Sequence, residues 1–375
     1  MDIAKATRRF EKWLASYTVL LSDDTASKHE LMKEGPFPFL RATFYRWVEQ
    51  WPAVCPRLAG RDQDVLLAVG DLHVENFGVW RDSRQRLVWG INDFDEACEL
   101  PFTSDLVRLA ASVVLAAETA HLDAPANWVC ALLLAGYRAG LRSEGKPILL
   151  GDGRHPVLVK LTSNTQEDAK TFWKEKLDPD DNPKIDAAAL PTGLEEMFRA
   201  SFRRGADLTF RLQRSPGGLG SLGRRRFTAV EKARQGVRDA REAKALVPSA
   251  QYWWAGQDQM CSQTATLLQH AIRDPDPHFQ VHDQWLIRQL APDVAKIEMP
   301  TSQRDKRLAL APALLRLMGW ETANVHLGSR SRDELENLLK GLDRDKLWCA
   351  TATERMAACT RKDHAQWAEA VAKSE

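Results

Sequence analysis

The chain lacks the features that would place it in several common protein classes. Its six cysteines form no CxxC pair, and no histidine lies beside them at zinc-like spacing, which favours free thiols over a disulfide framework or zinc module. No stretch approaches the roughly 20 apolar residues of a membrane span. The formal net charge is only +1, which argues against broad attraction to nucleic acid or an anionic membrane. The chain also contains no internal repeat and no low-complexity tract.

What remains is the composition of a globular protein. With 375 residues, of which 44% are hydrophobic, the chain can bury a large core as one domain or two lobes. Its thirteen tryptophans are scattered, which favours core packing over a base-stacking surface. The apolar run at residues 13–21 is short and lacks a small-residue cleavage pattern, so we expect no signal peptide. These patterns predict a cytoplasmic protein with no nucleic-acid or membrane partner.

Residues 69–97 carry the strongest chemical signal. Asp71 and Asn76 lie five residues apart in one predicted turn, and an acidic cluster that contains Asp93 follows. Two short apolar runs separated by a polar tip lie between these groups, so the segment predicts a β-hairpin that returns both groups to the same end. Phosphoryl transfer with Mg²⁺ requires such an arrangement, with a carboxylate to orient the attacking hydroxyl, and an Asn and an Asp to hold the metal on the nucleotide phosphates.

The sequence Gly70-Asp71-Leu72-His73, with Asn76 and the later Asn92-Asp93-Phe94, resembles the catalytic and metal-binding loops of the protein-kinase-like superfamily. The GDLHxxN form is similar to that of the aminoglycoside and choline phosphotransferase branch. Further segments resemble an uncharacterised bacterial family, the domain-of-unknown-function family 2252, and together span most of the chain. They are FPFLRATFYRW at 37–47, GDLHVENFG at 70–78, NDFDEA at 92–97, DLVRLAAS at 105–112, GLGSLG at 218–223, REAKALVPSA at 241–250 and WLIRQLAP at 285–292.

The resemblance implies roles for the residues of both loops. Asp71 would accept or orient the proton of the substrate hydroxyl, as the catalytic base. Asn76 and Asp93 would bind Mg²⁺, for which oxygen donors are suited. Asp95 would be a second metal ligand or a helix cap. His73 would contact a phosphate or shape the loop through a bond to the backbone.

Three further polar residues flank this segment. Asp105 begins a predicted helix, where it would be a plain N-cap or, as the resemblance implies, a brace for the catalytic loop; both are structural roles. Arg41 and Arg46 precede the catalytic strand. They would clamp a phosphate or an anionic substrate, or form ordinary salt bridges on a helix, and we prefer Arg41 for the functional role.

Residues 218–223 match the pattern G-x-G-x-x-G. Glycines let backbone N–H groups approach phosphates without interference from a Cβ atom. A dinucleotide-binding fold would require a helix directly afterwards, whereas residues 225–230 look like a strand. A Gly-rich turn between two strands is the kinase form. The predicted nucleotide-binding residues here are Gly218, Gly220, Ser221 and Gly223.

Lys244 lies on the next predicted strand, where the resemblance implies a lysine that binds the α- and β-phosphates of ATP. Lys232 is its rival at the end of the earlier strand. The usual partner is a glutamate on the following helix, but residues 249–275 contain no glutamate. Asp258 and Glu242 are the alternatives. This departure from the family pattern leaves the partner of Lys244 open.

The order of these pieces predicts a circular permutation. In ordinary kinases the Gly-rich loop and lysine precede the base and metal loops, whereas here the base and metal loops come first and the Gly-rich loop follows about 120 residues later. We therefore expect an α+β, protein-kinase-like, two-lobe fold with a helix-rich larger lobe. By family position, Gln289 and Leu290 would form the hinge that holds adenine. The predicted parts are 1–210 with N-terminal helices and the catalytic and metal loops, 211–300 as a β-rich nucleotide-binding lobe, and 301–375 as C-terminal helices that complete the helical lobe.

Local patterns predict the individual elements. Helices are expected within 3–34, at 105–120, 124–143, 195–210, 249–272 and 303–325, and in two charged segments that close the chain; strands are expected at 64–69, 77–80, 87–91, 225–230, 237–246 and 282–290. A turn is expected at Gln235-Gly236, and residues 144–195 are expected to be loop with helical insertions.

The expected function is an ATP- and Mg²⁺-dependent phosphotransferase that acts on the hydroxyl of a small molecule. One alternative is a nucleotide-binding pseudokinase or regulatory module without turnover. Another is an AMP transferase on the same fold. A binuclear metallophosphatase, suggested by Asp71-x-His73, would need a GNH-type loop that the sequence lacks. The partners are then a nucleotide and an unknown hydroxyl-bearing substrate, and the oligomeric state stays open.

Overall fold

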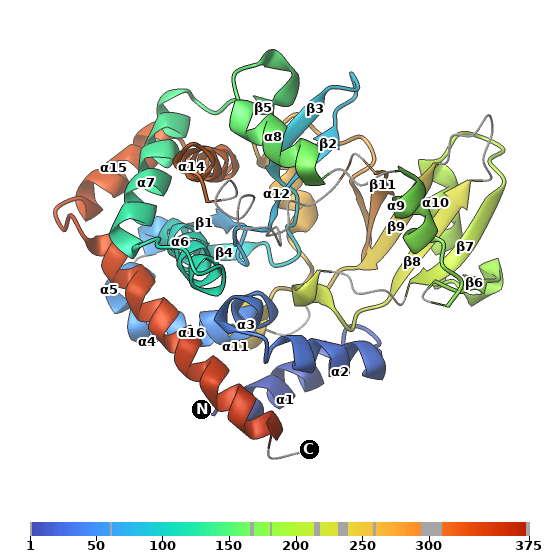
Figure 1. Ribbon diagram of the computed structural model, residues 1–375, viewed down its shortest axis with the longest axis horizontal. Helices are drawn as coiled ribbons and strands as arrows, with labels where there is room; N and C mark the ends of the chain where they lie inside the picture. The colour runs from blue at the N-terminus through green and yellow to red at the C-terminus, as the bar shows by residue number, and fades with distance from the viewer. Residues whose placement is uncertain are drawn as a thin grey trace.

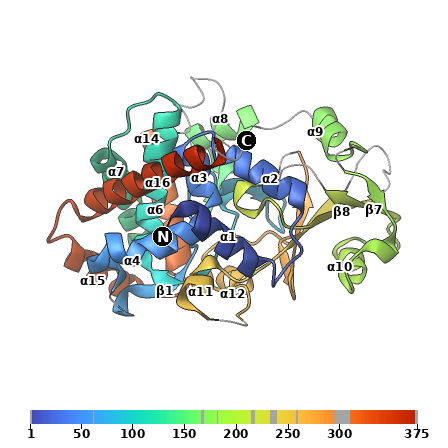
Figure 2. The ribbon, with the colours of Figure 1, turned by 90° about the horizontal axis from the view of Figure 1, so that it is seen from below.

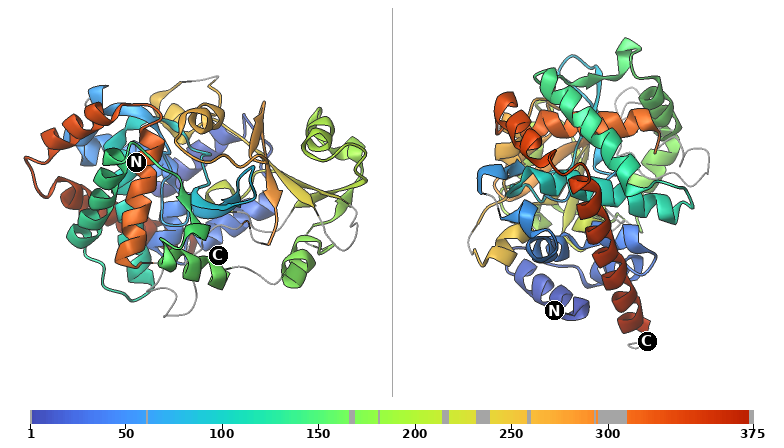
Figure 3. Two further views of the ribbon diagram at one scale, coloured as in Figure 1. Left: turned by 90° about the horizontal axis from the view of Figure 1, so that it is seen from above. Right: turned by 90° about the vertical axis from the view of Figure 1, so that its left-hand side faces the viewer.

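A body of helices and an antiparallel sheet make up the chain, and the sheet stands at the end of the molecule opposite α7, α14 and α15 (Figures 1 and 3). The computed structural model describes residues 2–60, 62–165, 169–180, 182–213, 218–231, 239–257, 260–292, 294 and 310–372. The described helices are α1 Ile3–Leu14, α2 Ser22–Leu31, α3 Pro36–Ala42, α4 Phe44–Val54, α5 Pro56–Ala59, α6 Phe102–Thr119, α7 Ala126–Arg142, α8 Pro156–Thr165, α9 Ala169–Lys176, α10 Leu194–Ser201, α11 Ala250–Ala255, α12 Thr264–His270, α14 Pro312–His326, α15 Arg332–Leu342 and α16 Trp348–Ala372.

The strands form three antiparallel sheets, so the fold is α+β as predicted. The sheet orders are β1-β4, β2-β3-β5 and β10-β11-β9-β8-β7-β6. The described strands are β1 Val65–Ala68, β2 Phe77–Arg81, β3 Leu87–Ile91, β4 Cys98–Pro101, β5 Ile148–Leu149, β6 Lys184–Ile185, β7 Leu208–Gln213, β8 Arg226–Glu231, β9 Ala240–Ala245, β10 Gln280–His282 and β11 Trp285–Leu290. Short 3₁₀ turns lie at η1 Asp62–Asp64, η2 Leu150–Asp152, η3 Ala187–Ala189 and η4 Leu219–Ser221.

Helix α6 runs through the middle of the helical body (Figure 1). It is buried from Phe102 to Ala117, as expected of a helix that is apolar on nearly every side. Helices α7, α14 and α16 pack around it, and their apolar side chains join those of α1, α3 and α4 in one large core. The charged residues Asp105 and Arg108 are exceptions within α6, and both are buried.

The six-stranded sheet has one apolar face and one charged face, because side chains alternate along each strand. On the apolar face, Phe227, Ala243 and Ile287 pack against α10 in a second, smaller hydrophobic cluster. The other face carries Arg226 and Thr228 of β8, Glu242 and Lys244 of β9, and Arg288 of β11. All except Arg288 are buried. Charged side chains are seldom buried without partners, so this face marks the side of the sheet where function is to be sought.

Most predicted elements are confirmed, with ends shifted by a few residues. They include the hairpin β2–β3, strand β1 before residues 70–76 (called the catalytic turn after its predicted role), strand β8 after the Gly-rich segment 218–223, and the helices α6 and α7 that follow the acidic cluster 92–97. The segment 3–34 is two helices, α1 and α2, and the two closing helices are α15 and α16.

Three element predictions were partly wrong. The helix predicted at 195–210 ends at Ser201, because the alternating apolar residues that follow belong to strand β7. The helix predicted at 249–272 is divided into α11 and α12, since Gly256 takes the left-handed conformation that ends a helix. The strand predicted at 282–290 is a hairpin of β10 and β11, with Asp283 at φ +48° in its turn.

Some predictions fall outside the described residues. These are Lys232, Asp258, the Gln235-Gly236 turn, the start of the strand at 237–246 and the start of the helix at 303–325, whose later part is α14. Among the described helices, none combines the length and apolar character needed to cross a membrane. The start of α1 and the end of α16 lie at the same face of the molecule, which Figure 2 views directly.

Candidate functional site

The hairpin β2–β3 brings the two polar loops together. Phe77 pairs with Ile91 at the open end of the hairpin, and the Asn92 N–H donates to the Asn76 carbonyl at 2.9 Å just beyond it. The turn that carries Asp71 and Asn76 therefore lies next to the loop that carries Asp93. This prediction from the sequence is confirmed.

Asp105 braces the catalytic turn. Its two carboxylate oxygens accept the backbone N–H groups of Val69 and Gly70 at 2.8 and 2.9 Å. His326 Nε2 lies 3.1 Å from Asp105 Oδ2, and the carboxylate is completely buried. The N-cap alternative was wrong, because α6 begins at Phe102 and Asp105 lies within its first turn.

Gly70 allows the catalytic turn and the acidic loop to touch. It has a φ of +80°, which L side chains rarely adopt, and a Cβ atom there would lie 2.2 Å from the Glu96 carbonyl oxygen. Both the backbone conformation and the close approach of the two loops require glycine at this position.

The carboxylate of Asp71 is held by Arg108, a contact that the sequence analysis missed. Arg108 Nε donates to Asp71 Oδ1 at 2.9 Å, and a second guanidinium nitrogen bonds the same oxygen. The guanidinium lies between the rings of Phe44 and Trp47, 5.0 Å from each centroid, and donates to the Leu40 carbonyl at 2.8 Å. The sequence did contain a signal for this contact. Arg108 lies in an apolar helix three residues after Asp105, and residues three apart lie on the same face of a helix.

Asp71 has the electrostatic character of a base. Burial raises its pKa to about 7; the attraction of Arg108 opposes this shift, and the nearby charges of Glu96 and Asp93 add to it. A carboxyl group with a pKa near neutrality is suited to general acid–base work at ordinary pH.

His73 and Asn76 shape the turn. The Asn76 Oδ1 accepts the His73 N–H at 2.6 Å, and His73 Nδ1 accepts the Glu75 N–H at 3.2 Å. The bond to Glu75 corresponds to the loop-shaping alternative for His73. A carbonyl oxygen has two lone pairs, so Asn76 Oδ1 retains one for a metal ion.

Lys244 of the sheet reaches the acidic loop. Its Nζ lies 2.5 Å from Asp95 Oδ2 and 3.7 Å from Asp93 Oδ1. These aspartates occupy the place expected for a glutamate on the following helix. The helix-cap alternative for Asp95 was wrong, because strand β4 follows it. The other oxygen of Asp95, Oδ1, is buried and has no hydrogen-bond partner among the described residues.

The Gly-rich segment lies directly against Asp71. It connects β7 to β8, and a Cβ atom at Gly220 would be 3.1 Å from the Arg41 carbonyl and 3.3 Å from Asp71 Oδ2. Ser221 Oγ accepts a hydrogen bond from Arg226, and the Gly223 carbonyl accepts the Leu21 N–H at 2.9 Å. Glycine at 220 thus lets the segment approach the candidate base.

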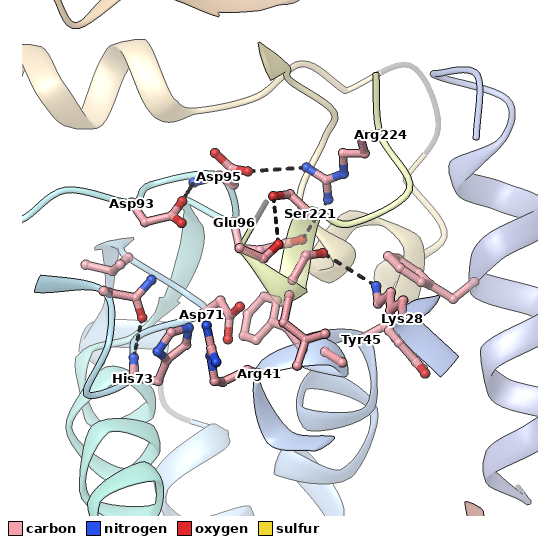
Figure 4. A pocket seen from close by; sticks show the side chains of 18 residues that line it. Lys28, Arg41, Tyr45, Asp71, His73, Asp93, Asp95, Glu96, Ser221 and Arg224 are labelled. Atoms are coloured by element: carbon pink, nitrogen blue, oxygen red, sulfur yellow. Dashed lines mark hydrogen bonds and ion pairs between the residues drawn. The ribbon is translucent and has the colours of Figure 1, made fainter. Parts of the chain in front are cut away.

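A cavity of about 40 Å³ lies between the acidic loop, the catalytic turn and the Gly-rich segment (Figure 4). Space of this size holds a few water molecules. The predicted residues that line the cavity are Arg41, Asp71, His73, Asn76, Asp93, Asp95, Gly218, Gly220 and Ser221.

The predicted hinge residues and the two predicted arginines differ in where they lie relative to the cavity. Gln289 and Leu290 do not line the cavity; they pair with Arg241 and Ala240, three and four residues from Lys244 along β9. Arg41 lines it and forms an ion pair of 2.7 Å with Glu75. Arg46 instead joins Asp363 of α16 at 2.5 Å, so its role is structural.

A charged row crosses the sheet behind Lys244. Glu242 lies 2.8 Å from Arg226 and 2.9 Å from Arg288. Burial opposes ionisation of Glu242, but Arg288, Arg226 and Lys244 outweigh it and hold its pKa at about 2. Arg226 and Arg288 outnumber Glu242, whereas Lys244 is paired with Asp95 and Asp93, so the two arginines leave one positive charge in this row that could attract a phosphate.

The donor set fits a metal ion shared with phosphate. Over the described part of the chain, no three His, Cys, Asp or Glu side chains form a group able to hold a metal ion by themselves. Mg²⁺ usually takes one or two carboxylates together with substrate phosphates and water. Asp93, the buried Oδ1 of Asp95 and the amide oxygen of Asn76 provide such a partial set.

Comparison with known proteins gives one match. No curated protein and no solved structure matches the chain. Residues 20–179 match the model of a family described as "Uncharacterized protein conserved in bacteria (DUF2252)". This range contains the catalytic turn, the hairpin, the acidic loop and α6, but neither the Gly-rich segment nor Lys244. Over residues 20–179, the chain is therefore similar to this uncharacterised bacterial family, as the sequence motifs indicated.

Proposed function

We propose that the protein is an ATP- and Mg²⁺-dependent phosphotransferase that acts on the hydroxyl of a small molecule. One observation carries the proposal: Asp71, Asn76 and Asp93 border the same cavity as the Gly-rich segment, although a large part of the chain separates them in sequence. A base, metal-binding oxygens and backbone amides able to meet phosphates are the parts that phosphoryl transfer requires.

The proposal includes a kinase-like, circularly permuted fold. It is supported by a sheet face that carries charged side chains, and by the position of Lys244 on β9, the strand that pairs with β8 after the Gly-rich segment. The acidic loop precedes that segment in the chain, whereas α14, from the C-terminal part, packs beneath the hairpin. Surface positions of both chain ends make a permuted order tolerable.

In the proposed reaction, Asp71 accepts the proton of the acceptor hydroxyl. The acceptor oxygen forms a bond to the terminal phosphorus of ATP, while the bond from that phosphorus to the bridging oxygen breaks. The electron pair of the broken bond leaves with ADP. A positioned base of this kind contributes about 10²–10⁴-fold in rate. Arg108 orients the carboxylate, and its own packing between two aromatic rings fixes its position.

Asn76, Asp93 and Asp95 would hold the metal ion. When bound, Mg²⁺ supplies positive charge to the β- and γ-phosphate oxygens. In the structure, the Lys244 ammonium lies between the carboxylates of Asp93 and Asp95, where it neutralises part of their charge. If a metal ion took these oxygens, Lys244 would be available to bind the α- and β-phosphates, which is the role that the family resemblance implies for it.

The first test is titration calorimetry of Mg²⁺–ATP into the full chain, followed by mass spectrometry of products from a metabolite extract. We expect binding and a phosphate adduct with ADP release. Asp71→Asn should lower turnover about 10²–10⁴-fold and leave nucleotide binding intact. Asp93→Asn should weaken binding itself, since it removes metal-ligand charge. Absence of Mg²⁺–ATP binding to folded protein would reject the proposal.

A second candidate function is nucleotide binding without turnover. It is favoured by one observation: Arg108 bonds the carboxylate of Asp71, the group that would have to accept the proton of the acceptor hydroxyl. In that case, Mg²⁺–ATP would bind but no product would form, and Asp71→Asn would leave the affinity for Mg²⁺–ATP and the absence of product unchanged. An AMP adduct in the same experiment would indicate nucleotidyl transfer instead.

A further inference from the structure

Lys28 of α2 is a buried cation in the cavity that neither the family motifs nor the proposed reaction explains. It is 7% exposed and lines the cavity, near Phe10 and Tyr45. Among the described residues, its one hydrogen bond is a long one, 3.5 Å from Nζ to the Gly220 carbonyl. An ammonium has three donors, so most of the hydrogen-bonding capacity of Lys28 is unused there.

The other cations of the cavity have carboxylate partners. Arg41 pairs with Glu75, and Arg224 lies 3.5 Å from both Asp95 and Glu96. Within the described ranges, Lys28 has no carboxylate at ion-pair distance. Burial lowers the pKa of Lys28 to about 8, and the nearby charge of Arg224 adds to the shift, while the charges of Glu11, Glu96 and Asp71 oppose it. An anion bound between these two cations would relieve both effects.

The position of Lys28 separates it from the metal side of the cavity. Figure 4 shows Asp93 to one side of Asp71, and Lys28 with Tyr45 to the other. In the proposed reaction, Asp93 would help to hold the terminal phosphate on its side of Asp71, so the acceptor hydroxyl would meet Asp71 from the remaining side. Lys28 would then lie on the acceptor side, while Lys244 lies with Asp93 and Asp95.

We propose that the acceptor carries an anionic group, a phosphate or a carboxylate, and that Lys28 binds this group beside the acceptor hydroxyl. This inference rests on the proposed phosphotransferase function and adds the substrate class to it. The Gly220 carbonyl orients the Lys28 ammonium toward the cavity, and Arg224 is the second cation within reach of the same anion.

The burial of Lys28 predicts that its removal lowers anion binding without lowering stability, whereas removal of a lysine with a structural role would lower stability. A buried ammonium with few partners is unfavourable for folding, whereas a methionine fills a similar volume without charge. Lys28→Met should therefore keep or raise the unfolding temperature while it removes anion binding. Lys28→Arg keeps the charge, and Lys12→Met on the exposed surface of α1 is the matched control.

The experiment titrates inorganic phosphate, and separately acetate, into the full chain, with and without saturating Mg²⁺ and AMP-PNP. AMP-PNP fills the terminal phosphate position, so added anion must bind elsewhere. We expect wild type and Lys12→Met to bind one of the anions with millimolar affinity, and Lys28→Met to bind it at least about tenfold more weakly, in line with loss of one charge-assisted bond. Lys28→Arg should stay within about threefold of wild type. Stronger binding of phosphate or of acetate identifies the anionic group of the acceptor.

Four outcomes overturn the inference. Equal anion affinity in wild type and Lys28→Met removes the role of Lys28, and absence of anion binding by wild type removes the site. Weaker AMP-PNP binding by Lys28→Met, with anion binding unchanged, assigns Lys28 to the nucleotide instead. If AMP-PNP fails to bind any variant, the proposed function fails, and the acceptor assignment falls with it even where phosphate still binds at Lys28.

Discussion

The catalytic turn and the Gly-rich segment meet at one cavity but are held in place by different forces. Backbone hydrogen bonds fix the turn: Asp105 accepts the N–H groups of Val69 and Gly70, and Ser112 accepts the N–H of Val74 at 3.0 Å. Side-chain charges hold the segment and its sheet. Arg224 meets Asp95 and Glu96, and Lys244 meets Asp93 and Asp95.

This difference predicts that the two sides of the cavity respond differently when a ligand binds. Bonds from a buried helix to the backbone persist whatever the ligand, so the turn presents Asp71 and Asn76 in a preformed geometry. The charge contacts can be exchanged, because a metal ion or a phosphate offers the same side chains alternative partners. We therefore expect the sheet side to respond to ligand and the turn side to stay fixed.

The largest effect is expected from Gly70→Ala. The added Cβ atom would overlap the Glu96 carbonyl oxygen. Because this oxygen and the Gly70 backbone are both held in place, we expect the free energy of unfolding to fall by more than about 4 kcal/mol. Gly205→Ala is the matched control, because Gly205 has a similar φ of +75° but no described atom within 4 Å of the place that an alanine Cβ would take. It should lose only about 1 kcal/mol. Denaturant unfolding measures both, and equal losses would show that the contact with Glu96 does not fix the turn.

A smaller, ligand-dependent effect is expected from Lys244→Met. Removal of this cation takes an ion-pair partner from both Asp93 and Asp95, which should lower the free energy of unfolding by about 3 kcal/mol in the absence of Mg²⁺. Millimolar Mg²⁺ should restore much of the loss, because the metal no longer competes with Lys244 for Asp93 and Asp95. Thermal unfolding against Mg²⁺ concentration measures this. Exposed Lys340→Met should match wild type, and an equal response to Mg²⁺ in all three proteins would contradict the shared site.

The smallest effect is expected from pH. Asp71 must be ionised to act as a base, and its pKa is raised to about 7, so ADP release should rise through pH 7 and fall about fivefold between pH 7 and pH 6. The raised pKa also means that ionisation disfavours the folded state. Relative to Asp71→Asn, wild type should therefore lose stability as pH rises from about 4 to about 7. A rate of ADP release that stays constant between pH 6 and pH 7 would exclude Asp71 as the base.

The amount that could be predicted from sequence differed between the two sides of the cavity. The hairpin and the positions of Asp71, Asn76 and Asp93 followed from local alternation and short motif spacing, and the bracing role of Asp105 followed from the family resemblance. The partner of Lys244 did not, because the family pattern pointed to a helix glutamate and the contact depends on how the sheet docks. Arg108 and Lys28 were missed for the same reason: each belongs to a helix far in sequence from the group it faces.

The sequence by itself determined the elements and the chemistry of the two loops, since hydrophobic period and turn residues act over a few neighbouring positions. The tertiary structure decided which charges meet. The pairs Asp71–Arg108 and Asp95–Lys244, and the approach of Lys28 to the Gly220 carbonyl, arise only when α2, α6 and the sheet pack around the hairpin. Burial then sets the energy of each charge, and burial is a property of the folded chain as a whole.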